Sequence, residues 1–255
     1  LDDSLCFYDG FNLNGTIVSF VDSISWEQIS GPSALTYSDI NDLNTSVSGF
    51  VGGVYEIVLY GYNDNCSGHS DTVTISVFDV DLSELSITDV SCFGFADGEI
   101  QLEANNGADP YVFSLDGGAY TANTVYSSLD TGAYTFVVQD FIGCSDTLIS
   151  SITEPDTLSL SLTGTDITCS TFLDGSVSST TVGGTLPYVY AWSNLAVTPD
   201  IFGLDSGQYI LTITDDNGCT ASDSVILTSP PPVIVNAGLD DSLCFYDGFN
   251  LNGTI

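Results

Sequence analysis

The sequence has 255 residues, of which 34 are acidic and none is Lys or Arg, giving a formal net charge of −34 at neutral pH. Without Lys or Arg the chain has no basic patch for nucleic acid and no cleavage site for trypsin-like proteases. Hydrophobic residues still make up 43 % of the sequence, and they alternate with polar ones, so the acidity does not indicate disorder. A chain of this length can bury two or three hydrophobic cores.

The run from Leu1 to Ile17 occurs a second time, letter for letter, from Leu239 to Ile255. Identity over such a length predicts a tandem array with a 238-residue period, in which residues 233–255 open the next copy of the first module. We therefore expect the chain to be one segment of a longer protein whose partners in the array are further copies of itself.

Residues 1–80 form the first predicted module. Its expected strands are short and rich in β-branched and aromatic residues, with Trp26 anchoring a core. They are Thr16–Val21, Ile24–Glu27, Glu56–Tyr62 and Thr72–Phe78. His69 lies next to Ser70 and Asp71, but neighbours in sequence rarely converge as a catalytic triad does. We interpret this trio as part of a surface turn, and we expect no enzyme.

Residues 81–156 and 157–232 form the second and third modules, which align with each other. The pattern Cys-x(4)-Asp-Gly at Cys92 recurs at Cys169, and the Pro-Tyr pair at Pro110 recurs at Pro187, both at the same offset along the chain. The expected strands of the two modules are Glu99–Ala104, Tyr111–Leu115, Tyr134–Val138, Thr147–Ile152, Ser176–Thr181, Tyr188–Trp192, Tyr209–Thr214 and Ser224–Leu227. Short linkers are expected at Asp79–Leu82, at Glu154–Thr157 and at the proline run from Pro230, and no amphipathic helix is found.

A shared unit, Gly-x-Tyr followed by a strand, a turn and a Cys, occurs once in each module. Its tyrosines are Tyr55, Tyr134 and Tyr209. A tyrosine at the start of a late strand, with its hydroxyl bonded to nearby backbone, is the tyrosine corner of Greek-key β-sandwiches. The unit predicts three such corners in an all-β chain of tandem β-sandwich modules, which we expect to be arranged as a rod.

Six of the seven cysteines fall into consecutive pairs, separated by 60, 52 and 50 residues. This spacing predicts one disulfide in each module, namely Cys6–Cys66, Cys92–Cys144 and Cys169–Cys219, with Cys244 paired to a cysteine beyond residue 255. Thiolate metal binding is disfavoured, because there is no Cys-x-x-Cys and the sequence has only one His. Disulfides indicate an oxidising, extracellular setting.

Calcium is the one cofactor that the sequence makes a candidate. Asp64, Asp215 and Asp216 supply hard oxygen ligands in the turns just before Cys66 and Cys219. The same residue types are also common in ordinary hairpin turns, which we consider the better interpretation. No stretch is long and apolar enough for a transmembrane helix, so no membrane insertion is expected in this segment.

The motifs together resemble a known family. Residues 169–219 carry Cys-x(4)-Asp-Gly, then Pro-Tyr-x-Tyr-x-Trp-Ser, then Leu-x-x-Gly-x-Tyr before a final Gly-Cys, and they resemble the SprB-type repeat of giant gliding-motility adhesins of Bacteroidota. Residues 92–144 resemble it less fully. Residues 1–80 resemble a PKD-like, immunoglobulin-type domain through Leu13-Asn14-Gly15-Thr16, Trp26, Ser30-Gly31-Pro32, Tyr37-Ser38-Asp39 and Gly53-x-Tyr55.

This resemblance implies export by the type IX system and a very long filament on the outer cell surface. The filament would act in surface attachment, gliding or capture of prey cells, gripping surface polysaccharide or other cells. Apart from the resemblance, we expect the chains to run side by side as a homo-oligomer, because a sequence slightly longer than one period is what a periodic assembly would yield. Asp-Ser/Thr-aliphatic triplets also resemble the O-glycan acceptor of Bacteroidota. The candidate acceptors are Ser4, Ser23, Thr72, Thr147, Thr157 and Ser224.

An alternative hypothesis is a carbohydrate-binding spacer in a large secreted polysaccharide-degrading enzyme. Aromatic residues that could stack on sugar rings are Phe7, Tyr8, Phe245 and Tyr246. Packing in a core beside the disulfides is the competing role for these side chains, and we favour it.

Overall fold

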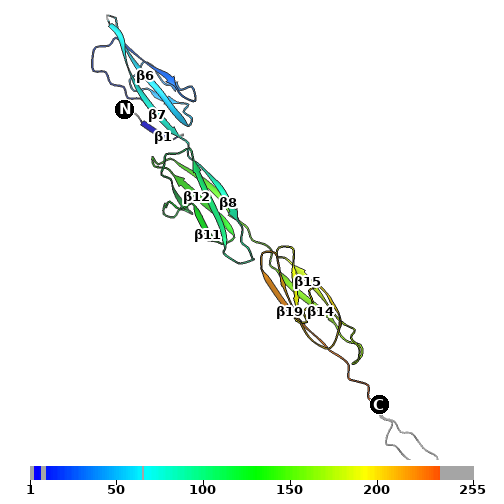
Figure 1. Ribbon diagram of the computed structural model, residues 1–255. Coiled ribbons are helices and arrows are strands. Elements are labelled where there is room, and N and C mark those ends of the chain that lie inside the picture. The colour runs from blue at the N-terminus through cyan, green and yellow to red at the C-terminus, as the bar shows by residue number, and fades with distance from the viewer. Residues whose placement is uncertain (1–2, 7–9, 65, 236–255) are drawn as a thin grey trace, which may run out of the picture. The chain divides into compact units, whose positions relative to one another are not determined.

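The computed structural model describes residues 3–6, 10–64 and 66–235, with only the backbone of Cys66 and Ser67. Their regular structure consists of strands, without a helix, so the all-β prediction is confirmed for this part of the chain. Three groups of strands follow one another along the chain (Figure 1). Each group has its own hydrophobic core. The chain divides into two compact units, residues 1–90 with 96–153, and residues 91–95 with 154–255.

The first module is a sandwich of a four-stranded sheet, in the order β1-β7-β6-β3, and a three-stranded sheet, in the order β2-β5-β4. Strand β1 runs parallel to β7, with Cys6 opposite Phe78. The strands are β1 (Asp3–Cys6), β2 (Phe11–Asn12), β3 (Ser23–Ser30), β4 (Thr36–Tyr37), β5 (Ser46–Ser48), β6 (Gly53–Asn63) and β7 (Cys66–Phe78). Trp26 anchors the core as predicted, buried with its indole N–H donating to the carbonyl of Asp42 at 2.9 Å.

The second and third modules share one topology. Each has two three-stranded sheets, ordered β11-β9-β8 and β10-β12-β13 in the second module and β17-β15-β14 and β16-β18-β19 in the third. The second module comprises β8 (Asp81–Thr88), β9 (Gly98–Asn105), β10 (Val112–Leu115), β11 (Val125–Leu129), β12 (Gly132–Gln139) and β13 (Ser145–Ile152). The third comprises β14 (Ser159–Thr165), β15 (Gly175–Val182), β16 (Val189–Trp192), β17 (Ile201–Leu204), β18 (Gly207–Thr214) and β19 (Thr220–Leu227).

The cores follow from the alternation of apolar and polar residues along the inner strands. Phe136 and Val138 on β12 are fully buried, and so are Leu211 and Ile213 at the matching positions of β18. Cys6 and Phe78 of the first module pack against the core of the second. This packing accounts for the first two modules forming one compact unit although each has a core of its own.

Two predictions about strands are wrong. Residues 16–21 do not form a strand, and within them Val18 and Phe20 are almost fully exposed, at 100 % and 96 %. The sheet pairing of this stretch ends earlier, where Gly15 N–H donates to the carbonyl of Leu43. The linker predicted at Asp79–Leu82 ends two residues early, because β8 already begins at Asp81.

Candidate functional site

The predicted disulfides within single modules are wrong. The structure instead bonds Cys6 to Cys144, with 5.2 Å between their Cα atoms, and Cys92 to Cys219, with 5.7 Å. Each bond joins the first cysteine of one module to the second cysteine of the following module. Cys169 is therefore a free thiol rather than the partner of Cys219. The partner predicted for Cys244 lies outside the described residues, as does Cys244 itself.

The strand lengths explain why Cys6 and Cys66 cannot meet. Cys6 lies opposite Phe78, the last residue of β7, whereas Cys66 is the first residue of that strand. At about 3.3 Å per residue, 12 steps of strand separate these two ends by about 40 Å. A disulfide needs Cα atoms roughly 4.4–6.8 Å apart, so the pair is excluded.

The same geometry holds in the second module. Val90 N–H, two residues before Cys92, donates to the carbonyl of Thr153 at 3.0 Å, just past the end of β13. Cys144 directly precedes the start of that strand at Ser145. The cysteines of this module thus lie at opposite ends of an eight-residue strand, about 26 Å long.

The third module repeats this arrangement. Ile167 N–H, two residues before Cys169, donates to the carbonyl of Thr228 at 3.1 Å, just past the end of β19, and Cys219 directly precedes Thr220 at its start. We call the end of a module near its last strand's final residue the trailing end, and the opposite end the leading end. Both disulfides join a trailing-end cysteine to the leading-end cysteine of the next module.

A buried aspartate holds the leading-end turn of the second module and that of the third. Asp215 is 4 % exposed and accepts hydrogen bonds from the backbone N–H groups of Cys219 and Thr185, both at 2.8 Å. Asp140, also 4 % exposed, accepts from Cys144 N–H at 2.8 Å and Ala108 N–H at 3.0 Å. A buried carboxylate without a cation must be satisfied by such donors, so these residues fix where the second cysteine lies.

The sequence carried a signal for these aspartates, since both Cys144 and Cys219 follow an Asp by four residues. Asp215 was predicted as a calcium candidate, and its two oxygens face backbone donors instead. Asp64 and Asp216 are exposed. Within the described residues no group of three or more His, Cys, Asp or Glu side chains could hold a metal ion. Calcium binding stays a prediction.

In the second and third modules, an exposed aspartate shortly before the trailing-end cysteine accepts a hydrogen bond from the residue that follows the last strand. Thr153 N–H donates to the carboxylate of Asp89, and Thr228 N–H donates to that of Asp166, both at 2.7 Å. The hydrogen bond from the backbone of Thr228 holds the pKa of Asp166 below its ordinary value. The matching contacts show that the two loops are built in the same way.

The three predicted tyrosine corners have the expected hydrogen bonds. Tyr134 and Tyr209 donate to the carbonyl four residues earlier, at 2.8 Å and 3.0 Å. The hydroxyl of Tyr55 is 2.6 Å from Ser33 Oγ, accepts from Val51 N–H at 2.7 Å and also contacts the Val51 carbonyl at 3.1 Å.

The glycine of the Gly-x-Tyr unit is explained by its backbone. Gly53, Gly132 and Gly207 have φ angles of 141°, 155° and 156°. Glycine, which lacks a Cβ, adopts such positive φ angles far more readily than other residues. The unit therefore encodes one structural corner three times.

All six O-glycan candidates are exposed. The aspartate of the triplet also has a local structural role, since it accepts a hydrogen bond from the next residue's N–H at Ser4, Thr72, Thr147 and Ser224. Asp146 and Asp223 additionally accept from the N–H of Leu82 and of Leu162, both at 2.9 Å. Glycosylation stays a prediction, with its acceptor hydroxyls accessible.

The trio around His69 lies in strand β7 rather than in the predicted turn. His69, Ser70 and Asp71 are exposed and consecutive, and His69 is paired with Gly61. Neighbouring residues of a strand point to opposite faces of the sheet. The three side chains are therefore not brought together as a catalytic triad.

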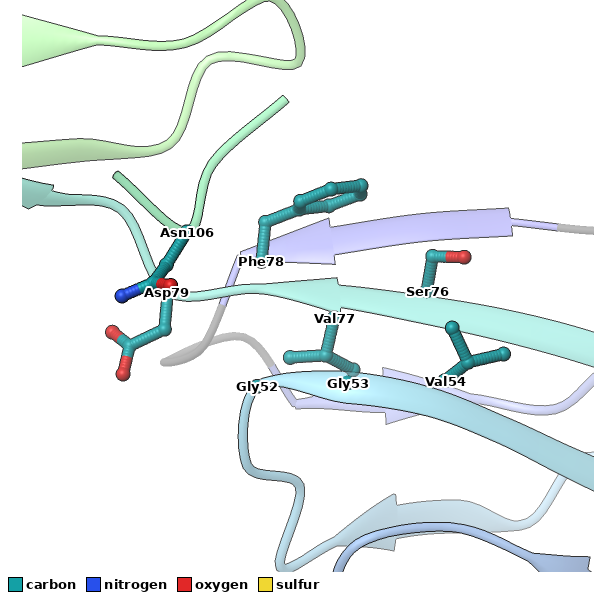
Figure 2. A pocket seen from close by; sticks show the side chains of 8 residues that line it. All are labelled: Gly52, Gly53, Val54, Ser76, Val77, Phe78, Asp79 and Asn106. Carbon is teal, nitrogen blue, oxygen red and sulfur yellow. The ribbon is translucent and has the colours of Figure 1, made fainter. Parts of the chain in front are cut away.

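A hollow of about 530 Å³ lies in the first compact unit, where β6 begins and β7 ends. Figure 2 shows Asp79 and Asn106 together at one end of it, next to Phe78. Its lining offers one carboxylate, one amide and the hydroxyl of Ser76, beside glycine backbone and the side chains of Val54 and Val77. These groups do not include a nucleophile paired with a base, so they do not define a catalytic site.

The fold and these contacts define a class of protein, an all-β chain of tandem β-sandwich modules in which disulfides connect one module to the next. Two segments, residues 85–120 and 161–197, match the SprB repeat family model. Each matched segment contains the trailing-end cysteine of its module, Cys92 or Cys169. The comparison with curated proteins found no match.

Among solved structures, similarity extends to proteins with immunoglobulin-like and PKD domains. The N-terminal eight Ig domains of Down Syndrome Cell Adhesion Molecule are 12 % identical over 91 % of this chain and 36 % of theirs, with a TM-score of 0.46. The ectodomain (Ig1–Ig3) of mouse nectin-like molecule 4 is 10 % identical over 91 % of this chain and 99 % of its own, with a TM-score of 0.36. The PKD domain of the KIAA 1837 protein is 22 % identical over 30 % of this chain and 78 % of its own, with a TM-score of 0.28.

A search of the described residues for a helix long and apolar enough to cross a membrane found none.

Proposed function

We propose that this chain is a repeat segment of a very long extracellular filament or adhesin on a cell surface, without enzymatic activity. The observation that carries the proposal is the pair of SprB repeat matches at residues 85–120 and 161–197. The identical runs at 1–17 and 239–255 support it, because they indicate an array of such segments. Within this role the filament acts in surface attachment, gliding or capture of other cells, and it reaches the surface through the type IX system.

The bonds between modules suit a protein that carries tension. A load that unfolds the modules is passed across Cys6–Cys144 and Cys92–Cys219, so most of the residues that these bonds span are protected from stretching. Because disulfides persist in oxidising surroundings, this support is available outside the cell. Repetition then lengthens the filament, and each added module can fold around its own core.

Chains of the filament are proposed to associate side by side as well as in tandem. With a charge of −34 on each chain, lateral contacts must rely on apolar residues, hydrogen bonds or bridging cations. Exposed carboxylates such as Asp64 and Asp216 are where calcium would act, and surface polysaccharide or another cell would be the adhesive partner.

Antibodies raised against residues 81–235 test this proposal on the source cells. Immunogold electron microscopy should label periodic filaments on the outer surface, and the Fab fragments should reduce attachment, gliding or capture. If the antibodies instead label only a secreted polysaccharide-degrading enzyme and no surface filaments, the result would contradict the proposal and favour a carbohydrate-binding spacer. The aromatic residues on which that alternative rests lie outside the described residues.

The same preparation tests the role of calcium. Filaments imaged in calcium and after chelation should lose lateral order in chelator if bridging cations join the chains. Unchanged order after chelation would contradict a structural calcium ion.

A further inference from the structure

Cys169 occupies the position that Cys92 has in the preceding module. Each cysteine opens the same motif, Cys-x(4)-Asp-Gly. Phe95 N–H donates to the carbonyl of Cys92 at 3.0 Å, and Phe172 N–H donates to that of Cys169 at 2.9 Å, so the two cysteines begin the same turn. Cys92 is bonded to the leading-end cysteine of the following module, whereas Cys169 is a partly exposed free thiol.

Cys66 occupies the position that Cys144 and Cys219 have in their modules. It begins β7, the strand after the one that carries the tyrosine corner, just as Cys144 and Cys219 directly precede β13 and β19. It is therefore the leading-end cysteine of the first module. Its counterpart in the next copy of the repeat is the leading-end cysteine of the module that follows the one carrying Cys169.

We propose that Cys169 forms a disulfide with the counterpart of Cys66 in the following copy of the repeat. Every junction between consecutive modules then carries one bond, and all six cysteines of the 238-residue period are paired. The proposal rests on the tandem repeat and on the two bonds already described, and it holds or fails independently of the adhesive role.

The sequence separation agrees with this pairing. The described bonds span 138 and 127 residues. Adding the period of 238 to position 66 and subtracting 169 gives a span of 135 residues for the proposed bond, between the two observed values. The alternative partner within the module, Cys219, is already bonded and lies at the other end of β19.

A partner in the same chain is favoured over one in a neighbouring chain. Only about a dozen residues connect the end of β19 to the position equivalent to the start of β1 in the next copy. A connection of that length holds two groups at an effective concentration on the order of millimolar. A cysteine of a separate chain has no such advantage before the chains associate.

The environment of the Cys169 thiol favours thiol–disulfide exchange. Hydrogen bonding to the backbone and hydroxyl of Thr171 lowers the pKa of Cys169, which raises the fraction of the reactive thiolate. The Cys169 thiolate attacks the disulfide of an oxidant, forms a mixed disulfide with one of its sulfurs and displaces the other sulfur as a thiolate. The partner cysteine then attacks this mixed disulfide and releases the remaining sulfur of the oxidant. Two protein thiols are oxidised to one disulfide, while the oxidant disulfide is reduced to two thiols that take up the two protons.

A recombinant array of two 238-residue copies tests the proposal. Cys66→Ser in the first copy and Cys169→Ser in the second remove the two thiols that have no neighbour in so short an array. The proposal predicts that the denatured, unreduced protein has no titratable thiol and migrates as a monomer on a non-reducing gel. A digest should contain the Cys169 peptide of the first copy linked to the Cys66 peptide of the second. Two titratable thiols per chain would overturn the proposal.

A matched control separates a local bond from a general folding failure. Adding Cys169→Ser in the first copy should expose one titratable thiol, in the second-copy Cys66 peptide, while the other disulfides stay intact. Covalent dimers of the test array joined through these two cysteines would overturn the assignment to a single chain. In protein isolated from the cell surface, alkylation of native thiols should leave Cys169 unmodified, and an alkylated Cys169 would likewise contradict the bond.

Discussion

Stretching single molecules should reveal the disulfide pattern, because a bond removes the residues it spans from the length that force can extend. The informative variant combines Cys92→Ser with Cys219→Ser and keeps Cys6–Cys144. After unfolding, the path from Cys6 to position 219 then consists of that bond and the stretch of chain from Cys144 to position 219. At about 3.5 Å per residue this stretch is about 260 Å long.

Pairing within modules predicts a much longer molecule for the same variant. Two of its three bonds would be lost, which leaves the 153 residues between Cys66 and position 219 free to extend, about 540 Å. The unsubstituted protein does not distinguish the two patterns. With bonds between modules, force can extend the 52 residues between Cys92 and Cys144. With bonds within modules, it can extend the 51 residues of the two linkers. The extension is about 180 Å for both patterns.

The assay is optical-trap or atomic-force extension of the 255-residue chain with handles at its termini, first oxidised and then with reductant. The handles add the same terminal residues to every variant. Cys6→Ser with Cys144→Ser is the matched control, and it should extend by the 86 residues before Cys92, about 300 Å. Full reduction should bring every variant to about 750 Å between positions 6 and 219. An extension of about 540 Å for the Cys92→Ser, Cys219→Ser variant would refute the assignment of bonds between modules.

Three further predictions concern stability. Tyr55→Phe should cost about 1.5–3 kcal/mol because it removes the hydroxyl of a fully buried side chain and its hydrogen bonds to Ser33 and to the backbone of Val51, whereas Tyr209→Phe, which removes an exposed hydrogen bond, should cost about 0.5–1 kcal/mol; equal costs in urea denaturation would contradict this. Asp215→Asn should cost about 2–4 kcal/mol, because an amide supplies one acceptor where the carboxylate supplies two, and an unchanged urea midpoint would contradict the role of this residue. Because its folded pKa lies below the ordinary 3.8, Asp166 contributes stability that is present above that value and is lost as pH falls through the folded pKa. Asp166→Asn should therefore flatten the acid side of a plot of Tm against pH, and an unaltered plot would contradict that contribution.

The corners and the all-β class could be predicted because their signals are local. Each corner needs a glycine for its positive φ and a tyrosine two residues later, and both are visible in a short motif. Most inner strands also show period-two alternation, as at Tyr209–Thr214. Strand β8, Asp81–Thr88, was missed because Leu85 and Ile87 are exposed and a bulge between Glu84 and Ser86 interrupts its register.

The disulfide partners could not be predicted from spacing, because spacing does not tell which end of a module a cysteine occupies. Cys6 and Cys66 follow one another as cysteines in the sequence, yet they lie at opposite ends of β7. That fact depends on β1 running parallel to β7, a long-range pairing with no local signature. The buried role of Asp215 was missed for a related reason, since its donor Thr185 lies 30 residues away.

Disulfide mapping of the 255-residue chain distinguishes bonds between modules from bonds within modules. Because the sequence has no Lys or Arg, the unreduced, alkylated protein must be cut with chymotrypsin and an acidic-residue-specific protease rather than trypsin. Bonds between modules predict one linked peptide pair with Cys6 and Cys144 and another with Cys92 and Cys219. A linked pair with Cys92 and Cys144 would contradict this prediction, because it would return each bond to a single module.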